Sequence, residues 1–298
     1  MKVLITGASG LLGHDLWKLL ELKHELVALG RTRASWIDPA RYRECDLTNA
    51  ARTYTVITKE NPEVVIHAAA YNNVDGAESE PDAAYKGNAL ATRNIAIACQ
   101  RFDTTLITLS TDYVFDGSEA PDTGYREFDP CRPVNTYAQS KRWGELYVQQ
   151  LLSKYFIVRT SWLFGPSRTT WVDRVAESAQ HDKPIDAAQD MVSAPTYTPD
   201  LAQAVQHLCE SRHYGLYHIT NAGFCSRVEL AQGVLKINKI GSEKSIRKMK
   251  LADLRLPAKR PHFSGLDNLA WRLDGFPVLR PWQEALQDHF SRKKVATR

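Results

Sequence analysis

The sequence predicts an α/β fold built on a doubly wound parallel sheet, with a smaller, irregular α/β lobe after it. In the first half of the 298 residues, short apolar runs alternate with helical stretches. Runs that are apolar throughout are typical of strands buried on both faces, and the intervening helices cover a parallel sheet. The third observation is a glycine-rich turn directly after the first run.

Five apolar runs are the predicted strands of this sheet. They are KVLIT at 2–6, ELVALG at 25–30, VVIHAAA at 64–70, TTLITLS at 104–110 and YFIVRTS at 155–161. Counted in this way, 104–110 is the fourth strand. Beyond residue 165 prolines punctuate shorter elements, which indicates a change of architecture.

The change near residue 165 predicts two domains. Residues 1–165 form a dinucleotide-binding domain, to which 195–220 return with a helix at 200–210. Residues 166–298 form most of a substrate-binding lobe. In this lobe we expect the basic stretch 236–250 to be a solvated helix and loop, and 288–298 to be the last helix with a frayed end.

Gly7, Gly10 and Gly13 form a G-x-x-G-x-x-G turn between the first predicted strand and an amphipathic helical stretch. Glycines there permit a tight turn, close approach of the backbone to a pyrophosphate, and packing of the helix on the strand. The start of the helix also offers unpaired N–H groups to phosphates. The turn therefore predicts a Rossmann-type dinucleotide site.

The end of the second predicted strand indicates which dinucleotide binds. NAD-preferring sites carry an acid about 20 residues beyond the loop for the ribose 2′-hydroxyl, whereas an arginine accommodates a 2′-phosphate. This chain reads ALGRTR at 28–33, with Arg31 and Arg33 and no acid. We expect NADPH, with NADH as the alternative if the two arginines only solvate a loop.

Hydroxyl and acidic side chains crowd the end of the strand at 104–110, where the chain reads STDY at 110–113. Ligands of doubly wound sheets bind beyond the carboxyl ends of the strands, so we expect Thr111 at the reaction centre. Tyr137 and Lys141 lie four apart at the start of a predicted helix and share a face. An ammonium beside a phenol is expected to lower the phenol pKa from its usual value of about 10.

Composition narrows the classes of partner. The net charge of +4 is too small and too evenly spread to indicate nucleic acid. The five cysteines show neither CxxC pairs nor metal-ligand spacing. The apolar run that ends at Thr6 is too short for a signal peptide, and no segment reaches the roughly 18 apolar residues of a membrane span. We expect a cytoplasmic protein that binds neither nucleic acid nor membrane.

These motifs together resemble the extended short-chain dehydrogenase/reductase family, and more narrowly its dTDP-4-dehydrorhamnose reductase branch. The resemblance runs nearly end to end. The most specific motifs are STDYVFDG at 110–117 and RPHFSGLDN at 260–268, and others are GASGLLG at 7–13, CDLTN at 45–49, VRTSWLFG at 158–165 and APTYTPDLA at 194–202. The segments YNNVDGAE at 71–78 and QDMVSAPTY at 189–197 depart from the pattern.

The resemblance implies roles for individual residues. Thr111, Tyr137 and Lys141 match the catalytic triad. Positions expected to contact the dinucleotide are Gly7, Gly10, Leu11, Leu12, Gly13, Asp46, Leu47, Ala68, Ala69, Tyr71, Tyr137 and Lys141. Positions expected to contact the substrate are Val74, Thr111, Asp112, Tyr113, Trp162 and Arg260.

The resemblance further implies reduction, by NAD(P)H, of the 4-keto group of a nucleotide-linked 6-deoxyhexose, with dTDP-4-dehydro-L-rhamnose as the first candidate. The alternatives are another activated deoxysugar, or a non-catalytic NADP-binding regulator resembling the methionine adenosyltransferase β subunit. His14 and Asp15 stand where some relatives have magnesium-binding acids, so no required metal is expected. Monomer and homodimer both remain open.

Overall fold

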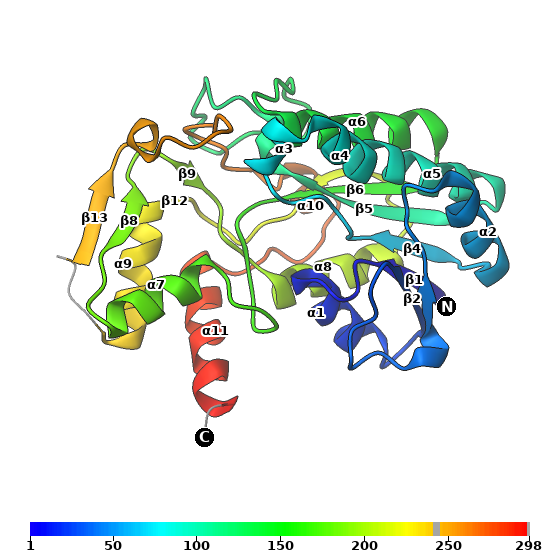
Figure 1. The fold of residues 1–298 in the computed structure, drawn as a ribbon, viewed down its shortest axis with the longest axis horizontal. Coiled ribbons are helices and arrows are strands. Elements are labelled where there is room, and N and C mark those ends of the chain that lie inside the picture. The colour runs from blue at the N-terminus through cyan, green and yellow to red at the C-terminus, as the bar shows by residue number, and fades with distance from the viewer. Residues whose placement is uncertain (241–244, 297–298) are drawn as a thin grey trace.

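The computed structural model describes residues 1–240 and 245–296, and its centre is a seven-stranded parallel sheet (Figure 1). The strand order is β11-β6-β5-β4-β1-β2-β3. The strands are β1 (Lys2–Thr6), β2 (Glu25–Gly30), β3 (Tyr42–Glu44), β4 (Val64–His67), β5 (Thr105–Thr111), β6 (Tyr155–Thr160) and β11 (Gly215–His218). The predicted doubly wound class is confirmed.

Two edge strands of the sheet, β3 and β11, were missed by the apolar pattern. β3 has only three residues, Tyr42–Glu44, and none of the three is fully buried because it lies at the sheet edge and pairs with β2 alone. The predicted strand at 104–110 is therefore the fifth strand in the chain, and counting it as the fourth was wrong. The expected strand at 64–70 also ends at His67, so that Ala68 to Ala70 form a loop.

Helices cover both faces of the sheet. On one face α1 (Leu11–Leu20) packs against α8 (Thr198–Cys209), and on the other α2 (Ala50–Glu60), α5 (Ala91–Arg101) and α6 (Thr136–Leu151) lie side by side (Figure 1). Between β4 and α5 the chain forms α3 (Gly76–Ser79), α4 (Pro81–Ala84) and a π-helical turn at Tyr85–Leu90. The helices leave a cavity at the carboxyl ends of β1, β4, β5 and β6.

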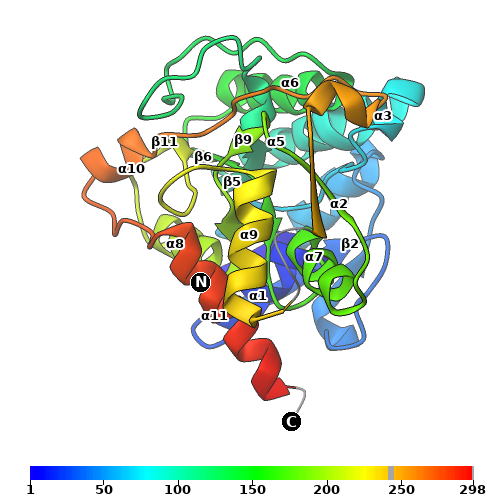
Figure 2. The same ribbon diagram turned by 90° about the vertical axis from the view of Figure 1, so that its left-hand side faces the viewer.

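A second hydrophobic core lies beside the sheet (Figure 2). It is built by α7 (Trp171–Gln180), α9 (Arg227–Asn238) and α11 (Trp282–Ala296), next to a pair of parallel strands, β8 (Ile185–Ala188) and β13 (Ile246–Met249). Short strand pairs tie this lobe together: β7 (Leu163–Phe164) with β10 (Thr196–Tyr197), and β9 (Val192–Ser193) with β12 (Cys225–Ser226). The remaining helix, α10 (Leu269–Leu273), packs near β11.

Two expectations for the second lobe need correction. The basic stretch 236–250 is not only helix and loop, because Ile246–Met249 form the strand β13. Its first residue, Ile246, is buried and pairs with Ile185 of β8. Residues 241–244 of that stretch lie outside the described residues. The last helix begins at Trp282, before the expected residue 288, and residues 297–298 are outside the description.

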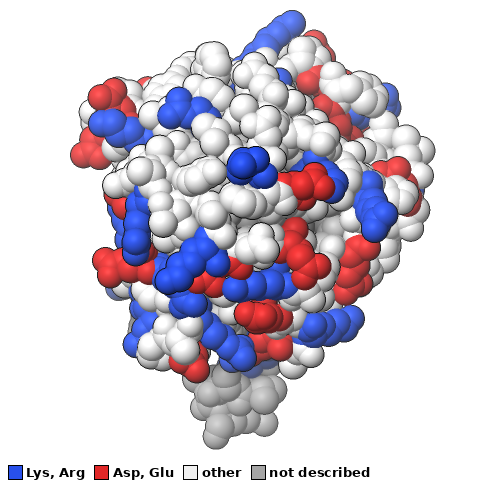
Figure 3. All heavy atoms as spheres, turned by 90° about the vertical axis from the view of Figure 1, so that its right-hand side faces the viewer, with Lys and Arg blue, Asp and Glu red and all other residues white. Residues whose placement is uncertain are grey.

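The surface carries both signs of charge. On the face shown in Figure 3, Lys and Arg alternate with Asp and Glu rather than forming a patch of one sign. In residues 1–240 and 245–296, no helix has the length and apolar composition that crossing a membrane requires.

Candidate active site

A cavity of about 360 Å³ lies at the carboxyl ends of β1, β4, β5 and β6. The predicted site residues that line it are Gly7, Gly10, Leu11, Leu12, Gly13, Ala68, Ala69, Val74, Thr111, Asp112, Tyr113, Tyr137, Lys141 and Trp162. Residues separated by up to 155 positions in sequence, Gly7 and Trp162, therefore line one space. The structure brings the glycine turn and the polar strand end together.

The glycine turn has no room for side chains. Gly7 has a φ of +69°, and a Cβ there would lie 2.6 Å from the Ala69 nitrogen. A Cβ on Gly13 would lie 2.1 Å from the Gly7 carbonyl oxygen. Helix α1 starts after Gly10 with no side-chain cap and no acid in its first turn, so its first N–H groups have no intrahelical partner. This turn fits the pyrophosphate of a dinucleotide.

The two arginines after β2 differ in their surroundings. Both side chains are exposed, and Arg33 donates a hydrogen bond of 2.5 Å to the Ile37 carbonyl. Arg31 instead acts on Asp46, whose pKa is lowered by hydrogen bonds from Thr48 and by the Arg31 charge. Neither arginine lines the cavity, and neither do Asp46 and Leu47.

Asp112 is a buried carboxylate whose oxygens are already used. It accepts hydrogen bonds from Ser264 Oγ at 2.5 Å, Ser193 Oγ at 2.9 Å and Thr111 Oγ1 at 3.1 Å. Burial raises the pKa of Asp112 to about 6, although these hydrogen bonds lower it. Asp112 thus connects the end of β5 with two segments of the second lobe, and its acceptor atoms are not free for a sugar.

Tyr137 stands at the start of α6, whose Asn135 side chain caps the helix by accepting from the Ala138 nitrogen at 2.8 Å. Its ring lies edge-on to that of Tyr113, with centroids 6.4 Å apart. Burial raises the pKa of the Tyr137 phenol, and hydrogen bonding with Thr111 lowers it. The net shift is upward, so the expectation of a lowered phenol pKa was wrong in this state of the site. A raised pKa keeps the phenol protonated at neutral pH.

Lys141 is buried one turn further along α6 and donates a hydrogen bond of 2.6 Å to the Leu109 carbonyl. Burial lowers the pKa of Lys141 to about 8, and the Glu145 carboxylate raises it. His67 lies nearby between Thr6 and Thr92, and burial, with the Lys141 charge, lowers its pKa to about 3. His67 is therefore neutral, and Lys141 is the cation on this side of the cavity.

Trp162 has an unusual backbone. Its φ is +41°, in the left-handed region that costs a non-glycine residue roughly 1–3 kcal/mol. The indole lines the cavity and packs against the buried cluster that contains Tyr113 and Met191, while its Nε1 is buried without a hydrogen-bond partner in the described residues. Strained residues of this kind gather at ligand sites.

The chain matches a known protein family over nearly its whole length. The family described as RmlD substrate binding domain matches residues 1–295. The chain belongs to this family. It is 34% identical over 295 residues to a dTDP-4-dehydrorhamnose reductase of Streptomyces griseus, covering 96% of this chain and 92% of the relative.

Other members of the RmlD family extend the comparison. A protein of Streptomyces antibioticus named a probable dTDP-4,6-dihydroxy-2-methyloxan-3-one 4-ketoreductase is 34% identical over 295 residues, covering 97% of this chain and 95% of the relative. The crystal structure of a dTDP-4-dehydrorhamnose reductase from Bacillus anthracis in complex with NADP has a TM-score of 0.85 at 33% identity. It covers 98% of this chain and 99% of that one. The resemblance to this branch is confirmed.

Besides Asp46 and Leu47, two more of the residues expected from the RmlD pattern lie outside the cavity. Arg260 donates a hydrogen bond of 2.9 Å to Asp75 Oδ2, and another of 2.9 Å to the Ala258 carbonyl. Tyr71 is held through its backbone by Asn88 and points its hydroxyl toward Glu80. Both already have protein partners.

Several cavity residues were not assigned from sequence. They are Ala70, Asn72, Leu109, Thr160, Ser161 and Leu163. All but Asn72 lie in the last residues of β5 or β6 or within three residues after β4 or β6, so the strand ends themselves were the signal. Asn72 is the exception, since it belongs to the segment that departs from the RmlD family pattern.

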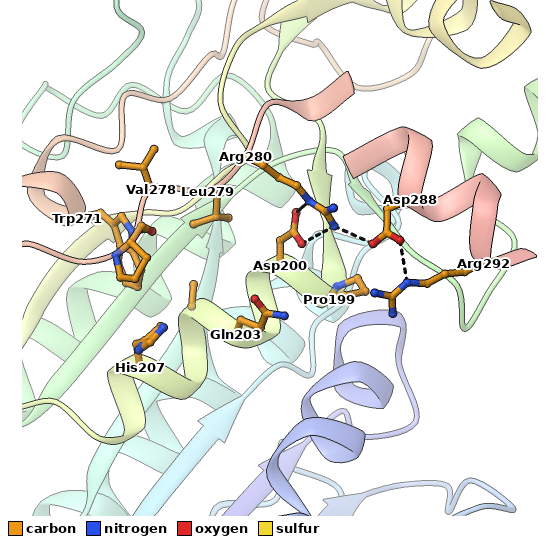
Figure 4. A pocket seen from close by; sticks show the side chains of 12 residues that line it. Pro199, Asp200, Gln203, His207, Trp271, Val278, Leu279, Arg280, Asp288 and Arg292 are labelled. Atoms are coloured by element: carbon orange, nitrogen blue, oxygen red, sulfur yellow. Dashed lines mark hydrogen bonds and ion pairs between the residues drawn. The ribbon is translucent and has the colours of Figure 1, made fainter. Parts of the chain in front are cut away.

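A second hollow, of about 470 Å³, lies between α8, the segment before α11, and α11 itself (Figure 4). Its charges satisfy one another: Arg280 binds Asp200 and Asp288, both at 2.8 Å, and Arg292 binds Asp288 at 3.0 Å. None of the site residues predicted for this RmlD family member lines it. Within the described part of the chain, no three His, Cys, Asp or Glu side chains gather in a way that could hold a metal ion.

Proposed function

We propose that the protein reduces the 4-keto group of a dTDP-linked 6-deoxyhexose with NADPH, and that dTDP-4-dehydro-L-rhamnose is the substrate. The observation that carries the proposal is the meeting of Thr111, Tyr137 and Lys141 in the cavity that the glycine turn also lines. The names of the relatives and the NADP complex of one of them support the same reading.

Tyr137 is the proposed general acid. When bound, NADPH supplies a hydride to the carbonyl carbon. Negative charge then develops on the carbonyl oxygen, and the Tyr137 phenol, kept protonated by its raised pKa, donates its proton to that oxygen. After proton transfer the charge rests on the phenolate, which the nearby Lys141 ammonium stabilises.

Thr111 is the proposed positioning partner of Tyr137. Its hydroxyl proton points to Asp112 Oδ1, and its oxygen also accepts a hydrogen bond from the Tyr113 nitrogen at 3.2 Å. With its own proton engaged by Asp112, Thr111 is not free to donate to the substrate carbonyl, and its hydrogen bond with the Tyr137 hydroxyl holds the phenol in place. It therefore orients the acid and does not polarise the carbonyl directly.

The division of the chain remains part of this proposal: residues 1–165 bind the dinucleotide, and residues 166–298 supply most of the substrate side. The return of α8 and β11 to the sheet supports the expected re-entry at 195–220. We also propose a cytoplasmic location, supported by composition, and either a monomer or a homodimer.

The test is oxidation of NADPH, followed by its absorbance, with dTDP-4-keto-6-deoxyhexose generated in situ. Turnover that requires the sugar and falls at least about a hundredfold in Tyr137→Phe supports the proposal. Wild-type turnover in Tyr137→Phe would remove that residue from the role. Tight NADPH binding without sugar-dependent oxidation would instead favour another ketosugar or the regulatory alternative, which co-purification with a synthetase would distinguish.

A further inference from the structure

Arg227, the first residue of α9, carries a charge that no acid balances. Its guanidinium carbon lies 3.6 Å from the centre of the Trp162 ring and 4.8 Å from that of Trp171. A separation of 3.6 Å places the flat guanidinium face to face with the indole. In the described residues the N–H groups of Arg227 have no hydrogen-bond acceptor and no carboxylate partner.

Arg260 and Arg159 differ from Arg227 in this respect. Arg260 is paired with Asp75, and the buried Arg159 is paired with Glu145 at 2.8 Å. The carboxylate that acts on Arg227 most directly is Asp112, and its oxygens are taken by three hydroxyl groups. Burial lowers the pKa of Arg227 to about 10, which leaves it charged at neutral pH.

The backbone fixes Arg227 beside the cavity. Ser226 caps α9 in a reciprocal box with Glu229, and β12 pairs Cys225 and Ser226 with Ser193 and Val192 of β9. The hydroxyl of Ser193 in turn holds Asp112. Figure 2 shows α9 beside α7, which carries Trp171. Hydrogen bonds therefore link the start of α9, through Ser193 of β9, to Asp112 at the end of β5.

Trp162 supplies the second observation. Its ring lines the cavity, its backbone is held at positive φ, and its indole N–H is buried without an acceptor. The Trp162 N–H and the unbalanced Arg227 guanidinium thus lie next to each other, with Trp162 lining the cavity and Arg227 stacked behind the lining. Oxygen atoms of an anionic ligand satisfy both, because guanidinium groups bind phosphates through two parallel N–H bonds.

We propose that Arg227, stacked on Trp162, binds the diphosphate of the nucleotide-linked sugar. This inference rests on the proposed function and adds a substrate contact to it. The sugar occupies the cavity between Tyr137 and Trp162, and the diphosphate leaves it past the edge of the indole. Arg260, whose guanidinium is occupied by Asp75 and a carbonyl, is then not the principal diphosphate ligand.

The test is calorimetric binding of dTDP and of thymidine to the intact protein loaded with NADP. In Arg227→Gln we expect dTDP to bind about tenfold or more weakly, with thymidine changed less than about twofold. Arg227→Lys keeps the charge but loses the flat group that stacks on the indole, so its dTDP affinity is expected to lie between those of the wild type and Arg227→Gln. Trp162→Phe keeps the ring and removes the N–H, and is expected to weaken dTDP severalfold.

Arg174→Gln is the matched control. It removes an equal charge from the exposed face of neighbouring α7, where Arg174 affects Arg227 by electrostatic repulsion. Equal losses in Arg174→Gln and Arg227→Gln, or unchanged dTDP affinity in Arg227→Gln, would overturn the inference while leaving the reductase intact. Failure of the wild-type protein to bind dTDP at all would overturn both.

Discussion

On the cofactor side of the cavity the decisive groups are backbone atoms, whereas on the substrate side they are side chains brought from distant segments. Gly7 and Gly13 act by having no side chain, within a turn of seven residues. Trp162, Ser193, Arg227 and Ser264 come from four different segments. A local backbone requirement leaves a trace in a short stretch of sequence, and a long-range assembly of side chains does not.

The largest effect is expected from a side chain introduced into the glycine turn on the cofactor side. In Gly13→Ala the new Cβ would lie 2.1 Å from the Gly7 carbonyl oxygen and 2.7 Å from the Ala8 Cα. Relief requires the turn to move, so we expect a loss of about 2–3 kcal/mol in unfolding free energy and a marked loss of NADPH affinity. Urea unfolding and fluorescence titration with NADPH measure the two effects.

Gly10→Ala is the control for that substitution. Its Cβ would meet one atom, the Gly7 carbonyl oxygen, at 3.0 Å, and Gly10 has an ordinary extended backbone. We expect a smaller loss than in Gly13→Ala. If the two variants lost NADPH affinity equally, space at Gly13 would not be the reason for glycine there.

The substrate side is tested by Asp112→Asn. The amide has one acceptor oxygen, so it cannot accept from Ser193, Ser264 and Thr111 together, and at least one buried hydroxyl loses its partner at a cost of about 1–2 kcal/mol. Because Thr111 orients Tyr137, kcat is expected to fall about tenfold. Ser193→Ala removes one donor without touching Thr111, and it should lower kcat less. The same kcat in both variants would contradict this positioning role.

Asp112→Asn also changes how stability depends on pH. The folded-state pKa of Asp112, about 6, lies above its ordinary value of 3.8. The stabilisation from protonated Asp112 is therefore present below pH about 4 and is lost as the pH rises through about 6. The unfolding free energy of the wild type, relative to that of Asp112→Asn, should fall over this range in urea titrations. A difference that stays constant or rises would contradict a raised pKa.

The same contrast explains what could be predicted. The alternation of apolar runs and helices predicted the central strands of the sheet, because buried parallel strands must be apolar. The edge strands β3 and β11 were missed because an edge strand need not be apolar throughout. Glycine spacing, the strand end at Thr111 and the shared face of Tyr137 and Lys141 predicted most of the cavity. The burial of Asp112, the pairing of Arg260 with Asp75 and the stacking of Arg227 depend on contacts between segments up to about 185 residues apart, which spacing does not encode.

The smallest effect is expected from Arg31→Ala, which tests the preference for NADPH on the cofactor side. Arg31 is exposed at the end of β2 and acts on Asp46, whereas Arg33 already donates to the Ile37 carbonyl. If Arg31 is the residue that accommodates the 2′-phosphate, Arg31→Ala raises KM for NADPH severalfold to about tenfold and leaves KM for NADH unchanged, because NADH lacks that phosphate. Arg33→Ala, which removes the same charge, should change KM for NADPH less. Equal changes for both cofactors in Arg31→Ala would show that the residue shapes the loop, and the preference for NADPH would then need a cause other than this arginine.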